Sequence, residues 1–495
     1  MISSSPRRSF LPALWLLVGL NIALVVARGI WHADYVPRLV QGDTLSYATA
    51  ARNLLAGHGF SVCEQPPYIP DNFRTPLYPA LLAALYLVAG AQPWLMIVVQ
   101  CLLSLLTLWL FVRATDVGFG ADVAQLGAYV WALSPLLLTC IHSLITETAF
   151  LTLFVASWWC WLLFVMRRRW GALVCAGVLL GLATLCRPAI QYVPLILAPL
   201  SALAAWRAAH SWRKTLAAGL LLLVMFGVVV APWMARNQRA LGTWKLSTAD
   251  GCHYFSQSAI LTLRAQFGHA ADVTRGGLYN VFFTHYTVSV TQEPYMATYW
   301  NFPLAACDDP ALLAGVRAAL GPVPAGGPIG LSNYVAVSRA QLHAAVAIIM
   351  QYPAAYARCV ARSTAQLLLM PPWQEVMRLV YPSFDAYAFA QAMAQRDWNH
   401  INAMPRTPVV FGIISAVITT AFSVGAIGFA LIGFVLMLRG KADICVKLAC
   451  VLLPAYFMAV TGGYGEARYR VAMLPVLFAL TAQGLCWLRS RCSRT

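Results

Sequence analysis

The sequence predicts an all-α polytopic membrane protein with about ten transmembrane helices, and three observations support this fold class. Of the 495 residues, 60% are hydrophobic and only 10% are charged, whereas ordinary soluble domains carry roughly 25% charged residues. The mean hydropathy is +0.69. Apolar runs close to the ~20 residues that cross a bilayer recur along the chain, separated by short polar segments. A water-soluble globular protein is therefore excluded.

Ten apolar runs have the length expected of a bilayer span, and they lie at 10–30, 94–112, 123–141, 148–165, 170–186, 189–205, 215–234, 408–438, 444–461 and 471–488. The first follows Arg7 and Arg8 and is too long for the core of a cleaved signal, so we interpret it as a retained anchor. An eleventh run, 76–90, would form a helix of only about 22 Å, short of a ~30 Å hydrocarbon core. We expect that helix to lie at the outer leaflet without crossing.

The charges agree with this topology. If 76–90 does not cross, six short cytoplasmic segments hold 15 of the 34 Lys and Arg residues, which is the positive-inside pattern. Of the 17 acids, the cytoplasmic side holds only Asp116, Asp122 and Asp443. The formal charge of +17 fits this membrane topology or an anionic ligand, and the absence of a dense basic tract with interleaved aromatics disfavours nucleic acid. We expect a multi-pass protein of the cell membrane with both termini in the cytoplasm.

The runs divide the chain into three parts. Residues 1–234 form a predicted N-terminal transmembrane catalytic module whose first outer loop is 31–93, 235–407 form a large extracytoplasmic region, and 408–495 form the C-terminal transmembrane helices. Within the large region, 321–330 is a loop by composition, and 341–369 has a helical amphipathic pattern broken at Pro353.

Two acids at the outer face are candidate catalytic residues. Asp43 begins a helical stretch in the first outer loop, where it could be a helix N-cap or a base toward a hydroxyl, and these two roles are compatible. Glu147 lies in a very short turn between two spans, where it could cap the next helix. Ionisable groups at that depth usually face an internal cavity, which favours a functional role.

The outer face also carries a group of arginines, against the positive-inside bias, namely Arg74, Arg187, Arg236, Arg468 and Arg470. Because the planar guanidinium binds phosphate through paired, charge-assisted hydrogen bonds, a lipid-linked phosphate would stabilise such a group. Lipid headgroups or the outer acids could do so instead, and Arg74 could simply extend toward headgroups.

Several short motifs occur in a characteristic order: Asp43 at a helix start, GHGF at 57–60, RTPLYP at 74–79, Glu147 in the second outer loop, PWMARN at 232–237 and EARYR at 466–470. In this order they resemble the type C integral-membrane glycosyltransferases, and most closely glycosyltransferase family 39, which includes the aminoarabinose transferases of lipid A and the protein O-mannosyltransferases. The similarity covers most of 10–250 and 440–490. The resemblance implies a polyprenyl-phosphate sugar donor, an inverting transfer at the outer face and no nucleotide sugar.

By motif, Asp43 matches the catalytic acid of the first loop, Glu147 matches the acid of the second, and Arg74 matches the basic residue near the donor phosphate. The chain departs from the family where Asp43 is followed by Thr44 and not by a second acid, and where Phe73 precedes Arg74 in place of an acid. Further candidates near these positions are Asp71, Glu64 and Tyr78. These departures bear on the substrate more than on the type of reaction.

The resemblance therefore implies a single displacement in which Asp43 accepts the proton of an acceptor hydroxyl and the lipid phosphate leaves toward the arginines. The acceptor would be a glycan, a lipid or a protein, and no nucleic acid is expected. Two carboxylates could hold a divalent metal, but we predict no cofactor. The alternatives are a transporter or flippase of a lipid-linked saccharide without transferase activity, and a non-catalytic membrane scaffold. The positions of the acids in loops or at helix ends count against a transporter.

Overall fold

The computed structural model describes residues 10–28, 43–63, 65–66, 68–267, 314, 334–463 and 465–493. Within these residues the ordered elements are helices and no strand occurs, which confirms the all-α prediction. The candidate Glu64 and the loop expected at 321–330 lie outside the described residues.

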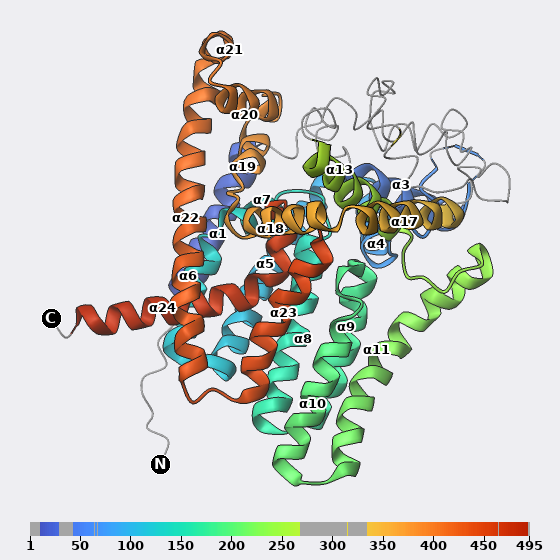
Figure 1. Ribbon diagram of the computed structural model, residues 1–495, viewed down its shortest axis with the longest axis vertical. Helices are drawn as coiled ribbons and strands as arrows, with labels where there is room; N and C mark the ends of the chain where they lie inside the picture. Colours follow the sequence, from blue (N-terminus) through green and yellow to red (C-terminus); the bar gives the residue numbers. More distant parts are fainter. Residues whose placement is uncertain are drawn as a thin grey trace.

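Helices carry all ten of the predicted apolar runs, and they form the bundle in the lower part of Figure 1. These helices are α1 (Leu11–Arg28), α5 (Pro93–Phe119), α6 (Ala121–Ala132), α7 (Pro135–Ile141), α8 (Glu147–Arg167), α9 (Trp170–Cys186), α10 (Val193–Ala209), α11 (Trp212–Leu241), α22 (Arg406–Arg439), α23 (Ile444–Thr461) and α24 (Leu474–Cys492).

By length and composition, seven stretches of the described chain can cross a membrane, or up to nine if each of two bent helix pairs counts as one span. The predicted run 123–141 is one of these pairs, because α6 and α7 meet at an angle of 60°. Pro135 starts α7 without a backbone N–H, and Ser134 caps the new helix by accepting a hydrogen bond from Leu137 N. The runs 10–30 and 170–186 form shorter apolar helices. The chain is thus a multi-pass membrane protein.

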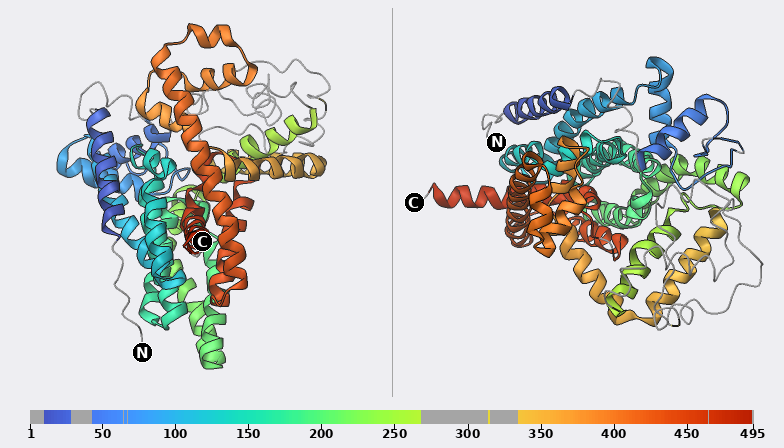
Figure 2. Two further views of the ribbon diagram at one scale, coloured as in Figure 1. Left: turned by 90° about the vertical axis from the view of Figure 1, so that its left-hand side faces the viewer. Right: turned by 90° about the horizontal axis from the view of Figure 1, so that it is seen from above.

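Helix α24 differs from its neighbours in direction. It is long and apolar enough to span, yet in Figures 1 and 2 it runs steeply across α22 and toward the side of the bundle. Two glycines allow the crossing, because a Cβ added at Gly433 would lie 1.9 Å from Leu480 O, and one at Gly484 would lie 2.2 Å from Phe429 O. The two backbones therefore touch directly, as small residues allow in membrane helices.

The remaining helices gather at the upper end of the bundle in Figure 1, which we call the loop end. They are α3 (Asp43–Leu55), α4 (Leu77–Ala89), η2 (Pro188–Ile190), α12 (Ala249–His253), η3 (Tyr254–Ala259), α13 (Ile260–Phe267), α17 (Tyr334–Gln351), α18 (Pro353–Leu369), α19 (Trp373–Val380), α20 (Ala386–Gln395), α21 (Trp398–Ala403) and η5 (Ala467–Met473).

Two features of the loop end agree with the sequence pattern, namely the length of α4 and the bend at Pro353. Helix α4 has 13 residues, about 20 Å at 1.5 Å per residue, which is too short to cross a bilayer. Helices α17 and α18 meet at 104° at Pro353, as the break in the amphipathic pattern predicts. Both lie across the top of the bundle, and the view from above in Figure 2 shows them bordering it.

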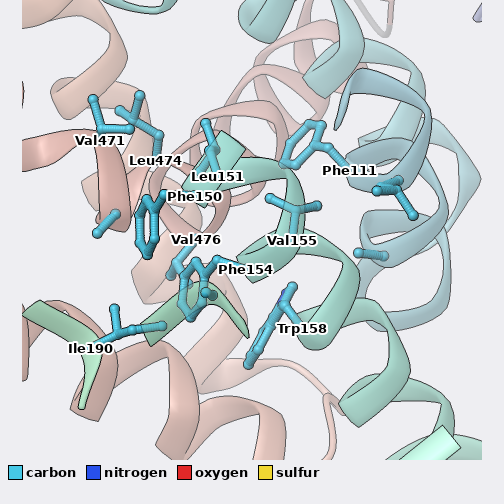
Figure 3. Close-up of a cluster of buried hydrophobic side chains, with 14 of the residues drawn as sticks. Phe111, Phe150, Leu151, Phe154, Val155, Trp158, Ile190, Val471, Leu474 and Val476 are labelled. Carbon is cyan, nitrogen blue, oxygen red and sulfur yellow. The ribbon is translucent and has the colours of Figure 1, made fainter. Parts of the chain in front are cut away.

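The apolar core beneath the loop end centres on α8 (Figure 3). Phe150, Val155 and Trp158 are buried on this helix, and Phe111 of α5 and Leu474 of α24 belong to the same cluster. This packing fixes the axial position of α8, and with it the position of its first residue, Glu147.

Candidate active site

Five charged side chains form one continuous chain of ion pairs at the loop end, which we call the ion-pair cluster. Arg74 Nη2 lies 2.8 Å from Asp43 Oδ1, and Arg468 Nη2 lies 3.2 Å from Asp43 Oδ2. Arg468 Nε lies 3.4 Å from Glu147 Oε1, which also lies 2.5 Å from Arg187 Nη1. With three arginines and two carboxylates, the cluster has a formal charge of +1.

The five residues come from separate elements. Asp43 and Glu147 are the first residues of α3 and α8, Arg74 precedes α4, Arg187 separates α9 from η2, and Arg468 lies on η5. Each lies at or close to a helix end, because the apolar runs between these residues form the helices of the bundle. The fold thereby brings a residue near position 43 against one near position 468.

Asp43 sits between two guanidinium groups, and this placement controls its charge. Burial alone would raise the pKa of its carboxyl, but Arg74 and Arg468 outweigh burial and hold the pKa well below its usual value. Its side chain is 36% exposed, so a ligand can reach it. The role of general base stays a prediction, and the two ion pairs make this carboxylate a weaker base than an ordinary aspartate.

Arg74 is held from several sides. Its Nε donates to Ser46 Oγ at 2.9 Å and its Nη1 donates to Tyr47 Oη at 3.1 Å, while the guanidinium stacks 4.5 Å from the centre of the Tyr47 ring. The side chain is 12% exposed. An arginine that merely extends toward lipid headgroups would not make these contacts, so that alternative is contradicted.

The buried carboxylate Asp71 shapes the turn before Arg74. It accepts hydrogen bonds from the backbone N–H groups of Phe73 and Arg74 at 3.0 and 3.3 Å. Burial raises the pKa of Asp71, although these two hydrogen bonds oppose the shift. Asp71 therefore holds the backbone of the turn that carries Arg74, and it does not itself join the ion-pair cluster.

Glu147 is the most enclosed member of the cluster, with a side chain that is 2% exposed. Its partner Arg187 makes one hydrogen bond, through Nη1, and Arg468 makes one, through Nη2 to Asp43. A guanidinium has five N–H donors, so both arginines keep donors that no described residue uses. These remaining donors are available to an anion that enters beside Asp43.

The structure does not bring two of the predicted arginines to the cluster. Arg236 donates to the backbone carbonyls of Asp71 and Phe60 at 2.7 and 3.2 Å. Arg470 is 5% exposed and donates to the carbonyls of Leu367, Leu368 and Met370 at the end of α18. Both hold backbone segments together, and the geometry does not support their predicted contact with the donor phosphate.

Tyr78 also lies in the packed interior and makes contacts that hold the structure together. It is fully buried, and its hydroxyl donates to Gln100 Oε1 at 3.0 Å. Its ring packs edge-on against Tyr47 at a centroid distance of 5.2 Å. Tyr78 therefore supports the wall behind Arg74 and lies outside the cluster.

Two aromatic residues near the cluster were not singled out from the sequence. The guanidinium groups of Arg187 and Arg468 lie 5.4 and 5.8 Å from the centre of the Tyr469 ring, and His253 meets the same ring edge-on at 6.4 Å. Tyr469 lies inside the EARYR motif, which could have drawn attention to it. His253 lies in a stretch without a recognisable motif.

Within the described residues, no group of three His, Cys, Asp or Glu side chains lies close enough together to hold a metal ion. Both carboxylates of the cluster are engaged by arginines. The expectation that the reaction uses no metal stays a prediction.

Residues 73–234 match the model of the family described as dolichyl-phosphate-mannose-protein mannosyltransferase. The matched segment includes Arg74, Glu147 and Arg187 of the cluster. No curated protein sequence matches the chain. The resemblance to type C glycosyltransferases, inferred above from short motifs, is confirmed by this match.

Two solved structures are similar to this chain along most of its length. ArnT from Cupriavidus metallidurans bound to undecaprenyl phosphate is 16% identical, with 94% of this chain and 77% of that chain covered and a TM-score of 0.38. The archaeal oligosaccharyltransferase AglB from Archaeoglobus fulgidus, in complex with an inhibitory peptide and a dolichol-phosphate, is 14% identical, with 97% and 50% covered and a TM-score of 0.48. This chain thus spans half the length of AglB.

Proposed function

We propose that the chain is a glycosyltransferase of the type C integral-membrane kind, a proposal that the family match over residues 73–234 supports. In this proposal it transfers a sugar from a polyprenyl-phosphate donor to an acceptor hydroxyl or phosphate at the outer face of the membrane, with inversion at the anomeric carbon. The observation that carries this proposal is the ion-pair cluster, in which Arg187 and Arg468 hold unused N–H donors beside the accessible carboxylate of Asp43. The large region 235–407 would then be extracytoplasmic and both termini cytoplasmic.

The charge of the cluster favours a single phosphate. A sugar joined to a lipid through one phosphate is a phosphodiester with one negative charge, which matches the formal charge of +1 on the cluster. When the bond to the sugar breaks, a second negative charge develops on the lipid phosphate. Guanidinium groups already in place stabilise that charge in a partly desolvated site, which is the usual source of the largest catalytic effect.

The carboxylates have separate roles in this proposal. Asp43 is the exposed acid, so it accepts a hydrogen bond from the acceptor hydroxyl and directs its oxygen toward the anomeric carbon. Glu147 is enclosed and fixes Arg187 and Arg468 in the orientation that a phosphate needs. Tyr47 and Ser46 keep Arg74 in place.

The test uses the purified full-length protein in detergent. Radiolabelled polyprenyl phosphates that carry mannose, glucose or aminoarabinose are supplied with membrane extract as the source of acceptor. We expect one donor to be consumed, with release of polyprenyl phosphate and a product of inverted configuration. Binding of these lipids without cleavage of the sugar–phosphate bond would favour the transporter or flippase alternative and overturn the proposal.

A further inference from the structure

His253, the last residue of α12, faces the ion-pair cluster although no motif marks it. Its ring meets Tyr469 edge-on at 6.4 Å, and Tyr469 is the ring that Arg187 and Arg468 also contact. The charges of Asp43, Arg74 and Arg187 all act on the imidazole. The imidazole therefore lies next to Tyr469 and within electrostatic range of Asp43.

The segment before α12 holds His253 at this place. Ser247 Oγ donates to Phe73 O at 2.8 Å, and Thr248 N donates to Asn72 O at 3.2 Å, so the segment is tied to the turn that carries Arg74. On the other side, a Cβ added at Gly251 would lie 2.0 Å from Ser338 O, which shows that α17 presses directly on α12. The position of the imidazole is thus set by both neighbours.

The tautomer of His253 follows from its hydrogen bond. Nδ1 lies 3.0 Å from Gln257 Oε1, and because that oxygen only accepts, Nδ1 carries the proton. Nε2 then presents a lone pair and makes no hydrogen bond with any residue of the described chain. Burial lowers the pKa of His253, so the ring is neutral at physiological pH.

The cluster lacks an effective base of its own. Both oxygens of Asp43 are paired with arginines, and Oε1 of the enclosed Glu147 is paired with two. A carboxylate in such a setting accepts a proton weakly, since a general base works best when its pKa lies near the operating pH. The imidazole of His253 is not paired with any arginine that the structure describes, and its Nδ1 is engaged by the neutral amide of Gln257.

We infer that His253 is a catalytic residue whose Nε2 receives the proton of the acceptor hydroxyl. This inference rests on the proposed function. The O–H bond breaks and its proton moves to Nε2, while the oxygen forms the new bond to the anomeric carbon. The bond from that carbon to the phosphate oxygen breaks, and its electron pair leaves with the lipid phosphate. Asp43 orients the hydroxyl and stabilises the imidazolium.

The first test is His253→Ala in the full-length protein, assayed with the donor that the wild type consumes. We expect transfer to fall by about 10²–10⁴-fold, the range for loss of a positioned base. Added imidazole should restore part of the activity, and the affinity for undecaprenyl phosphate should stay within about twofold of the wild type. His400→Ala, which removes an exposed histidine of α21, is the matched control and should change neither.

The second test changes the basicity of His253 without removing it. In Gln257→Glu, a carboxylate faces Nδ1 and should raise the pKa of the imidazole by about 1–3 units. Because the protonated ring cannot accept the hydroxyl proton, the rate falls as pH drops through this pKa. The acidic limb of kcat/KM should therefore move to higher pH in Gln257→Glu and disappear in His253→Ala.

The other charged groups near α12 are the same in the wild type and in both variants, His253→Ala and Gln257→Glu. Asp250 is paired with Lys245 at 2.7 Å, and Arg339 and His343 of α17 are exposed. A loss of activity in His253→Ala without imidazole rescue, or an acidic limb that stays in place in Gln257→Glu, would overturn the role of His253 while leaving wild-type transfer intact. Absence of transfer in the wild type would instead overturn the proposed function, on which this role depends.

Discussion

Asp43 is the residue at which the N-terminal and C-terminal parts of the chain meet. Its two carboxylate oxygens receive Arg74 from the first loop and Arg468 from the last pair of helices. Since the side chain is 36% exposed, solvent weakens these ion pairs and they contribute little to stability. Its importance should therefore appear in the reaction more than in the folding.

The first prediction compares Asp43→Asn with a matched substitution. Asp385 caps α20 by accepting from Tyr387 N and Ala388 N, and it is exposed at the loop end, so Asp385→Asn is the control. Transfer by Asp43→Asn should fall by about 10²-fold, the cost typical of a misplaced reactant. The free energy of unfolding should change by less than about 1 kcal/mol in both variants. Near-native turnover in Asp43→Asn would remove Asp43 from the reaction.

The second prediction concerns Arg74 and the binding of undecaprenyl phosphate. Arg74→Lys keeps the charge but loses the planar fork that holds Ser46, Tyr47 and Asp43 together. We expect Arg74→Ala to weaken binding by about 10–100-fold, as for loss of a charged hydrogen bond, and Arg74→Lys to weaken it less. Binding by calorimetry measures both, with the exposed Arg406→Ala as control. Unchanged affinity in both Arg74 variants would show that Arg74 has no part in phosphate binding.

At the scale of elements, the helix pair α22 and α24 depends on glycine. Gly433 and Gly484 let the two backbones touch, which positions α24 across the bundle and places η5, with Arg468, at its start. Bulkier residues would force the helices apart. The sequence shows these glycines, but it does not show which helix each one meets.

The third prediction tests this contact. Gly433→Ala puts a methyl group against Leu480 O and should destabilise the protein by about 1–3 kcal/mol, the usual cost of overpacking. Gly428→Ala, on the same helix but with no atom within 4 Å of the added Cβ, should be close to neutral. Thermal unfolding in one detergent compares them. Equal melting temperatures would show that α24 does not cross α22 at this point.

Whole-molecule topology gives the fourth prediction. In a Cys-less variant, Ala91→Cys after α4 and Arg167→Cys at the end of α8 place single exposed thiols for labelling. If α4 stays at the outer face, a membrane-impermeant reagent added to intact cells should label position 91 and leave position 167 unlabelled. Labelling of both positions from the same side would contradict the topology and the outward location of the cluster.

Local sequence patterns predicted the all-α class, the positions of the apolar helices, the break at Pro353 and, through their motifs, three charged residues of the cluster. Each of these follows from local properties, such as the length of an apolar run or a proline that removes a backbone donor. The same reasoning placed Arg187 and Arg468 at one face of the membrane, because they lie at helix ends.

Which of these residues meet depends on how the helices pack in three dimensions. The sequence predicts Arg236 and Arg470 at the same face as Arg187 and Arg468, yet they bind backbone carbonyls while the others pair with Glu147. The bend between α6 and α7, the crossing of α24 and the approach of His253 likewise depend on contacts between elements far apart in sequence. A local pattern cannot encode them, since the partner of a charged side chain is set by how whole helices pack.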